Sequence, residues 1–171
     1  GKDEKIYTPD TNRYHLYVSY ACPWAHRALI FRKLKHLEDH ITVDFVHPDM
    51  LDMGWSFKKE FPGVTGDSLH KKNYIHEIYQ LSDKMVSTKA TVPILWDKNT
   101  NTIVNNESSE IIRILNKSFN DLTNNHIDYY PTSLKSEIDE INDIIYKNIN
   151  NGVYKTGFSK TQSSYESAAE K

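Results

Sequence analysis

Apolar and polar residues alternate in two short segments near the start of the chain, and a helical pattern lies between them. Residues 14–20 (YHLYVSY) and 41–47 (ITVDFVH) are rich in Tyr, Val and Ile, as strands are. Residues 23–37 place apolar side chains every three or four positions, which indicates a helix with one buried face. The order predicts two parallel strands joined by a right-handed crossover. The expected buried face comprises Trp24, Ala28, Ile30, Phe31, Leu34 and Leu37.

The next seventy residues continue the mixture of helices and strands. Residues 48–70 contain three glycines and two prolines and predict a long loop, functional or mobile rather than part of the core. Residues 71–83 have a helical pattern, 91–97 and 102–104 read as a hairpin, and 106–119 as a helix. This order predicts an α/β fold with a thioredoxin-like arrangement.

A second region follows a polar segment. Residues 1–119 form the predicted thioredoxin-like domain, 120–133 a linker, and 134–171 the start of an all-α domain. In the last of these, isoleucines form one stripe up to residue 149, and Gly152 is a natural stop signal. Another helix begins near Thr161, and the chain ends inside it. Because two helices bury little by themselves, we expect this domain to be truncated or completed by another chain.

The composition narrows the function classes. The chain has 171 residues, is 38% hydrophobic and 26% charged, and carries a net charge of −2, so no basic excess suggests a nucleic-acid partner. No apolar run approaches the ~18 residues of a membrane span. The first ten residues have no apolar signal core, and the single Cys cannot form an internal disulfide. We therefore expect a cytoplasmic protein without a membrane or nucleic-acid partner.

The single cysteine lies where the first predicted strand gives way to the first helix. Cys22 precedes Pro23, a residue favoured at the first helical position, so Cys22 is expected near the N-cap. There its sulfur could accept from free N–H groups, and the helix dipole favours a negative charge. Both effects stabilise the thiolate, which is the nucleophilic form. His26 and Arg27 lie one turn on, and the sequence leaves the direction of their side chains open.

Cys22 has other possible roles. It could be a small buried core residue, as free cysteines often are. A zinc site is a weak interpretation, because Cys22 and His26 supply at most two ligands. A dithiol mechanism is excluded, since Ala25 stands where a CxxC motif needs its second cysteine. If Cys22 is catalytic, the second thiol must come from a small molecule.

Two further segments carry candidate binding groups. Pro93 stands at the start of a predicted strand and keeps Val92 extended; with a cis bond between them, the Val92 backbone could face Cys22 and pair with a peptide ligand. Glu107 and Ser108 open a predicted helix, where Glu107 could hold an ammonium group and Ser108 a carboxylate. The plainer alternatives are a strand-start proline and an ordinary helix cap.

Taken together, these segments resemble a known family. CPWAHR (22–27), Trp55 in GW, TVPILWDK (91–98), VNNESSEIIR (104–113) and INNGVYKTGF (149–158) are similar to the glutathionyl-hydroquinone reductases, or Xi-class glutathione transferases, including the fungal omega-like transferases. The likeness covers nearly all of residues 14–171. The last of these motifs is the more specific, because many thioredoxin-like proteins share a Cys-Pro and a cis-proline.

The resemblance implies a reaction that needs one protein thiol and glutathione as co-substrate, with no metal. Cys22 would attack the sulfur of a glutathionyl conjugate, release the reduced aromatic and remain as a Cys22–glutathione disulfide. A second glutathione would then regenerate the thiolate by thiol–disulfide exchange. The substrates would be small aromatic conjugates or mixed disulfides.

The resemblance also implies roles for the binding residues. Val92, before cis-Pro93, would pair with the glutathione backbone. Glu107 and Ser108 would hold its γ-glutamyl end, and Trp55 would cover it. From the residues alone, Trp55 would be an exposed loop aromatic.

Two other residues carry expectations from the resemblance. Lys89 replaces an Arg that usually stands three residues before the valine, and a lysine would hold a glutathione carboxylate less firmly. Tyr146 would contact the aromatic substrate, although by itself it reads as a residue at the edge of a helical core. The family forms a homodimer through a complete helical domain. Alternatives are an omega-type thioltransferase or dehydroascorbate reductase using Cys22, and a truncated, non-catalytic glutathione-transferase-like binding module.

Overall fold

The computed structural model describes residues 7–50 and 52–170, and the chain divides into two compact units after Asp128. Residues 1–6, 51 and 171 lie outside the described residues. They include most of the first ten residues, for which the sequence predicts no signal core.

The first unit is built around a sheet of four strands in the order β2-β1-β3-β4. β1 pairs in parallel with β2 and antiparallel with β3, and β3 pairs antiparallel with β4. The predicted parallel crossover and the predicted hairpin are therefore confirmed. The strands are β1 (Tyr14–Val18), β2 (Ile41–Phe45), β3 (Ile94–Asp97) and β4 (Thr102–Asn105).

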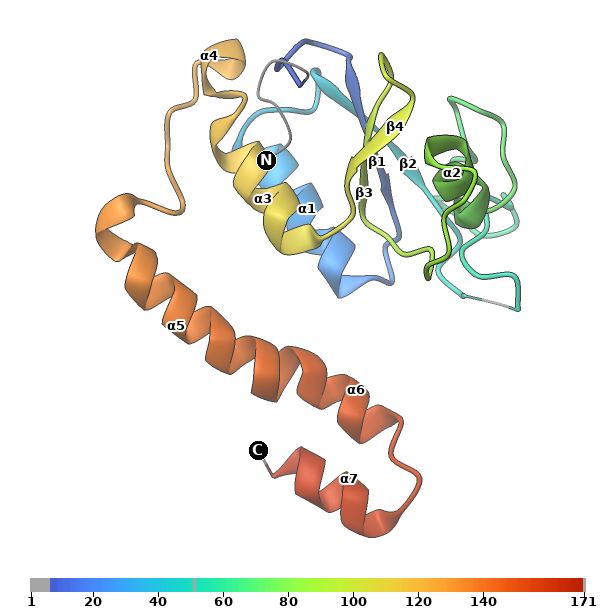
Figure 1. The fold of residues 1–171 in the computed structure, drawn as a ribbon, viewed down its shortest axis with the longest axis vertical. Coiled ribbons are helices and arrows are strands. Elements are labelled where there is room, and N and C mark those ends of the chain that lie inside the picture. The colour runs from blue at the N-terminus through green and yellow to red at the C-terminus, as the bar shows by residue number, and fades with distance from the viewer. Residues whose placement is uncertain (1–6, 51, 171) are drawn as a thin grey trace. The chain divides into compact units, whose positions relative to one another are not determined.

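Helices cover both faces of this sheet (Figure 1). α1 and α3 lie against one face, while α2 and the long loop before it lie against the other. Successive residues of β1 point to opposite faces: Tyr14 packs edge-on against Phe119 and Tyr17 against Phe57, both with ring centroids 5.6 Å apart. All five β1 residues are buried as a result, including the polar His15. The helices are α1 (Pro23–Leu34), α2 (Ile75–Ser82), α3 (Ser108–Lys117) and α4 (Asn120–Thr123).

The buried face of α1 agrees in part with the one that its apolar pattern predicts. Ala28 is fully buried, and Trp24 and Phe31 are partly buried against the core. Ala25 is also fully buried, whereas the predicted Ile30 and Leu34 are 43% and 39% exposed. Small side chains let this helix pack closely against its neighbour α3, and Ile30 and Leu34 lie toward solvent. Leu37 is buried as predicted, but it lies beyond the end of the helix.

The long loop before α2 is packed on the sheet rather than loose. Backbone hydrogen bonds join His47 to Ser56 and Phe57 to Asn73, each at 2.8 Å. The Asp67 carboxylate is buried, and it accepts a hydrogen bond from the Tyr17 hydroxyl at 3.0 Å. These bonds satisfy polar groups that the loop would otherwise bury without partners.

Charged groups are also buried in the first unit. Arg13 donates from Nε and Nη2 to the two carboxylate oxygens of Asp97, at 2.9 and 2.7 Å. Asp44 accepts from the Ser68 N–H at 2.6 Å and lies 3.3 Å from the His15 ring. Burial alone would raise the pKa of Asp44, but the contact with His15 and the hydrogen bond from Ser68 overcome that effect and lower it to about 2.

The boundary between the units falls nine residues later than the end of the predicted first domain at Phe119, because part of the predicted linker is attached to the first unit. The buried Lys35 ammonium donates to the carbonyls of Asn125 at 2.8 Å and Ile127 at 2.5 Å. Asn116 on α3 donates to the Asp128 carboxylate at 2.6 Å. The segment therefore belongs with α1 and α3 up to Asp128.

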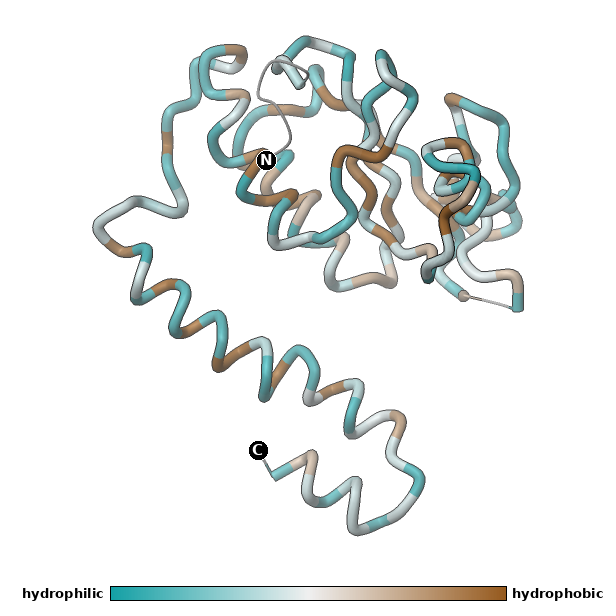
Figure 2. Tube along the Cα trace, in the orientation of Figure 1, coloured by the Kyte–Doolittle hydropathy of each residue, from teal (hydrophilic) through white to brown (hydrophobic). Residues whose placement is uncertain are grey.

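The second unit is helical, and hydrophobic residues alternate with hydrophilic stretches along α5 (Figure 2). Ile141 and Ile149, on the predicted stripe, are 51% and 60% exposed, so this unit buries little of its apolar face. Gly152 does not end the helix as predicted; it lies inside α6, and the turn-forming residues come only after Gly157. No helix in the described parts of the chain has both the length and the apolar character needed to cross a membrane. The elements are η1 (Thr132–Leu134), α5 (Lys135–Ile145), the π-helix η2 (Tyr146–Asn150), α6 (Asn151–Gly157) and α7 (Gln162–Ala169).

Candidate active site

Cys22 is the N-cap residue of α1, and Pro23 occupies the first helical position, as predicted. The cysteine is extended, with φ −92° and ψ 111°, and it is 8% exposed. Its sulfur was expected to accept from the N–H groups of the first turn, and this expectation is wrong. The thiol instead donates to the Val92 carbonyl oxygen at 3.4 Å, because that carbonyl is the acceptor packed against it. The first turn of α1 contains no acidic residue, so no carboxylate there offsets the positive potential of the helix N-terminus near the sulfur.

The Val92–Pro93 peptide bond is cis, which confirms the expected conformation. Val92 is buried, and its carbonyl faces Cys22 although the two residues are 70 positions apart in the sequence. Within the described residues, no protein group accepts a hydrogen bond from the Val92 N–H. A buried donor of this kind is well placed to pair with the backbone of an extended peptide ligand.

Glu107 is the N-cap residue of α3, and Ser108 is its first helical residue. One oxygen of the Glu107 carboxylate, Oε1, accepts from the Ser109 N–H at 3.1 Å. The Glu107 side chain is nevertheless 63% exposed, while Ser108 is buried. The cap that the sequence offered as the plainer alternative is therefore present, and it leaves a carboxylate at the surface beside a buried hydroxyl.

Arg27 is a site residue whose direction the sequence left open. Its guanidinium donates to the Ser108 hydroxyl oxygen from Nη2 at 2.7 Å and from Nε at 3.0 Å. Nη2 also lies 3.6 Å from the Glu107 carboxylate, and the guanidinium covers the Trp24 ring at 4.9 Å. Burial and the nearby Arg113 lower the pKa of Arg27, while Glu107 raises it. The sequence contained one signal for the direction of Arg27: Trp24 and Arg27 are three residues apart, so they lie on the same face of a helix.

Among the described residues, Val92 is the one predicted site residue that a hydrogen bond joins to Cys22; Glu107 and Ser108 are joined to Arg27, and Trp55, Lys89 and Tyr146 to neither group. Trp55 is partly buried against the core, so it is not the exposed loop aromatic that the residues alone suggested, and its carbonyl accepts from the Ile75 N–H at 2.9 Å. Lys89 is exposed between α2 and β3. Tyr146 begins the π-helix of the second unit and is half-exposed.

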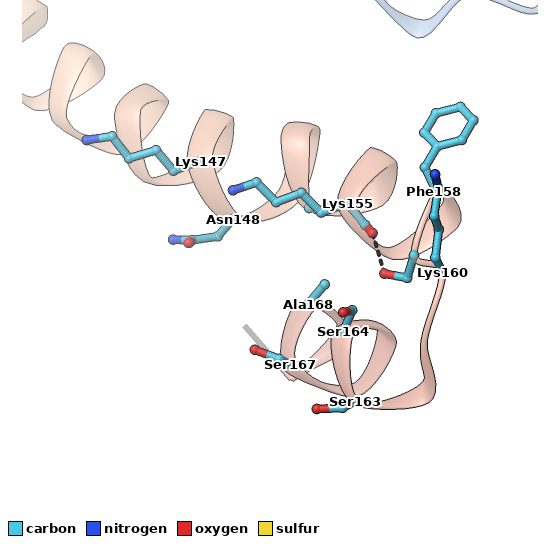
Figure 3. Close-up of a pocket in the computed structure, with 11 residues that line it drawn as sticks. Lys147, Asn148, Lys155, Phe158, Lys160, Ser163, Ser164, Ser167 and Ala168 are labelled. Carbon is cyan, nitrogen blue, oxygen red and sulfur yellow. Dashed lines mark hydrogen bonds between the residues drawn. The ribbon is translucent and has the colours of Figure 1, made fainter.

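The second unit has a hollow of its own, lined by residues of η2, α6, α7 and the turn between the two α-helices (Figure 3). Lysine and serine side chains dominate its lining, with Lys147, Lys155 and Lys160 among them. These side chains are solvent-exposed, and Lys147 is paired with Asp143 at 2.7 Å. Across the residues that the structure describes, no three His, Cys, Asp or Glu side chains gather as a metal-binding group.

The first unit thus combines, on a thioredoxin-like fold, a cysteine at a helix N-cap, a carbonyl before a cis-proline and an acidic helix start. The family model described as the N-terminal domain of glutathione S-transferase matches residues 21–118. The chain belongs to the glutathione S-transferase family.

Particular relatives confirm the resemblance to glutathionyl-hydroquinone reductases and Xi-class transferases. The glutathionyl-hydroquinone reductase YqjG of Escherichia coli is 52% identical over 162 residues, which is 95% of this chain and 49% of that protein. The omega-like glutathione S-transferase 2 of Schizosaccharomyces pombe is 51% identical, over 96% of this chain and 53% of that protein. The chain thus spans about half the length of the curated relatives it matches.

Solved structures agree with this placement. The glutathione-bound structure of YqjG superposes with a TM-score of 0.92 at 52% identity, covering 94% of this chain and 52% of that chain. The Xi glutathione S-transferase of Phanerochaete chrysosporium gives a TM-score of 0.90 at 51% identity, covering 95% and 56%. The predicted thioredoxin-like glutathione transferase fold is therefore confirmed.

Proposed function

We propose that this chain carries the glutathione site and the nucleophile of a glutathione-dependent thiol transferase that reduces glutathionyl-hydroquinones or similar mixed disulfides. The observation that carries the proposal is Cys22 at the N-cap of α1, with its thiol against the carbonyl that precedes cis-Pro93. The name of the bacterial relative and its glutathione-bound structure support glutathione and a hydroquinone conjugate as ligands.

The reaction needs two steps on one cysteine. The Cys22 thiolate attacks the glutathione sulfur of the conjugate, so an S–S bond forms while the bond from that sulfur to the aromatic carbon breaks. The electron pair of the broken bond goes to the aromatic carbon, which takes up a proton and leaves as the hydroquinone. A glutathione thiolate then attacks the glutathione sulfur of the mixed disulfide, which releases oxidised glutathione and restores the Cys22 thiolate.

The binding groups divide glutathione between them in this proposal. The Val92 backbone pairs with the peptide part of glutathione, and Glu107 with Ser108 holds the ammonium and carboxylate of the γ-glutamyl end. Trp55 covers the ligand, and Lys89 contributes a weak contact to a carboxylate. Tyr146, on the second unit, contacts the aromatic part of the substrate.

The test is an adduct measurement followed by turnover. After incubation with oxidised glutathione, mass spectrometry should find one glutathione on Cys22, and Cys22→Ser should carry none. The same variant should lose turnover of a glutathionyl-hydroquinone while isothermal titration still detects glutathione binding. Undiminished turnover by Cys22→Ser would contradict the proposal.

A second candidate uses the same cysteine. The fungal relative carries the name of an omega-like transferase, which favours a thioltransferase or dehydroascorbate reductase. Rates on a glutathionyl-hydroquinone, a small mixed disulfide and dehydroascorbate would separate the two activities. A non-catalytic glutathione-binding module would bind glutathione and turn over none of the three. The cytoplasmic location and the homodimer stay predictions.

A further inference from the structure

Arg27 connects the helix that begins at Cys22 with the residues that open α3. The Nε–H and Nη2–H on one edge of its guanidinium both point at the Ser108 hydroxyl oxygen, at 3.0 and 2.7 Å. Ser108 is 3% exposed, so water does not replace these charge-assisted bonds. The Trp24 ring under the guanidinium keeps the long side chain in place.

This contact decides which hydrogen-bonding role remains for the Ser108 hydroxyl. A serine hydroxyl has two acceptor lone pairs and one hydrogen to donate. The two Arg27 donors occupy its acceptor side, so the hydroxyl hydrogen must point elsewhere. Its one acceptor among the described residues is Glu107 Oε1, at 3.5 Å, which is the limit of a hydrogen bond. Ser108 is therefore left as a donor that lacks a good acceptor.

The neighbouring carboxylate is arranged in the complementary way. Every contact of Glu107 with another described side chain uses Oε1: the Ser109 hydroxyl at 3.1 Å, the Ser108 hydroxyl at 3.5 Å and Arg27 at 3.6 Å. Oε2 is left to the surface. The site thus presents an oxygen acceptor on one side and a hydroxyl donor, backed by a cation, on the other.

We infer that Arg27 is a positioning residue that commits the Ser108 hydroxyl to donating, and thereby makes this end of the site specific for a ligand carboxylate. The inference rests on the proposed function, in which that carboxylate belongs to the γ-glutamyl end of glutathione. Glu107 Oε2 is left to receive the ligand ammonium. A carboxamide in this position has no charge for the Arg27 cation to attract, and its N–H groups find no acceptor on a hydroxyl that Arg27 already occupies. Without Arg27, the Ser108 hydroxyl could turn and accept from such an N–H, so the preference for a carboxylate over an amide would be lost.

The experiment compares two ligands by isothermal titration on the full chain in a Cys22→Ser background, which prevents disulfide formation. One ligand is glutathione, and the other is its analogue with the γ-glutamyl carboxylate converted to a carboxamide. Arg27→Gln should weaken glutathione binding at least tenfold and change the affinity for the carboxamide less than twofold. Ser108→Ala should act in the same way, and the double variant should lose no more than either single one.

One further variant controls for folding, and another separates the charge of Arg27 from its geometry. Arg32 lies on the same helix and also donates two hydrogen bonds, to the carbonyls of Ile41 at 2.7 Å and Glu38 at 2.8 Å. Arg32→Gln should therefore leave both ligand affinities unchanged. Arg27→Lys keeps the positive charge but cannot donate two parallel hydrogen bonds to the Ser108 hydroxyl, so it should recover only part of the preference for the carboxylate.

The results distinguish failure of the inferred role of Arg27 from failure of the proposed function. An equal loss of affinity for both ligands in Arg27→Gln, or additive losses in the double variant, would overturn the role of Arg27 while glutathione binding by the parent chain still supports the proposed function. A parent chain that binds no glutathione at millimolar concentration would overturn the proposed function and this inference with it.

Discussion

The buried ion pair between Arg13 and Asp97 allows the most direct test of the packing in the first unit. Asp97→Asn keeps the size of the side chain but removes its charge, and only one amide oxygen remains for the two guanidinium donors. The Arg13 side chain is 7% exposed, so its cation would be left buried with a weaker partner. Breaking a buried pair costs about 3–5 kcal/mol. Arg13 keeps the Thr8 hydroxyl at 2.6 Å and the exposed Asp10 carboxylate at 3.4 Å, so we expect the low end, about 3 kcal/mol.

Urea unfolding followed by tryptophan fluorescence measures this loss, because all three tryptophans, Trp24, Trp55 and Trp96, belong to the first unit. A loss of about 3 kcal/mol should lower the urea midpoint by roughly 1.5–2 M.

The matched control for this prediction is the exposed pair between Lys33 and Glu38, at 2.6 Å, in which the lysine is 81% exposed. Glu38→Gln should cost less than about 1 kcal/mol. Adding Arg13→Met to Asp97→Asn should recover part of the loss, because the buried cation, which then has only the exposed Asp10 as a charged partner, is gone. The reasoning is refuted if Asp97→Asn costs no more than Glu38→Gln.

Three other predictions concern stability. The pKa of Asp44 is about 2 in the folded state and 3.8 in the unfolded state, so the ionised Asp44 stabilises the fold by about 2 kcal/mol above pH 4. This stabilisation is lost as the pH falls toward 2. The free energy of unfolding should therefore differ less between pH 3 and pH 6 in Asp44→Asn than in the parent chain. Lys35→Met leaves two carbonyls of residues 125–127 without their donor, so amide hydrogen exchange there should rise about tenfold or more, against an unchanged rate in β1. Gly54 has a φ of +79° and an open space where a Cβ would lie, so Gly54→Ala should cost about 1 kcal/mol in thermal unfolding, whereas Gly152→Ala inside α6 should not destabilise.

The sequence predicted the element order of the first unit because each element carries its own local signal. The alternation in residues 14–20 and 41–47 marked β1 and β2, and the Cys22–Pro23 pair marked the start of α1. The same kind of signal failed where packing decides between similar residues. On α1 the close approach of α3 favours small alanines in the interior, and a count of apolar residues does not contain that information.

The C-terminal end of the first unit also could not be predicted from a local sequence pattern. Residues 120–128 are polar and rich in turn formers, which is typical of a linker. They belong to the first unit because one buried lysine, Lys35, binds their carbonyls from 90 and 92 residues away. Gly152 misled for a related reason: a glycine signals a helix end only when the chain turns there, and here the helix continues.

By itself, the sequence determined a thioredoxin-like order of elements, one cysteine at a helix start, and a proline and an acidic cap in the positions that such a site uses. Only the tertiary structure decided what these groups touch. The Val92 carbonyl meets the Cys22 thiol across 70 residues, and Arg27 meets Ser108 across 81. Hydrophobic periodicity specifies which face of an element is buried, but the direction of one polar side chain depends on the donors and acceptors that other elements bring within about 3 Å of it.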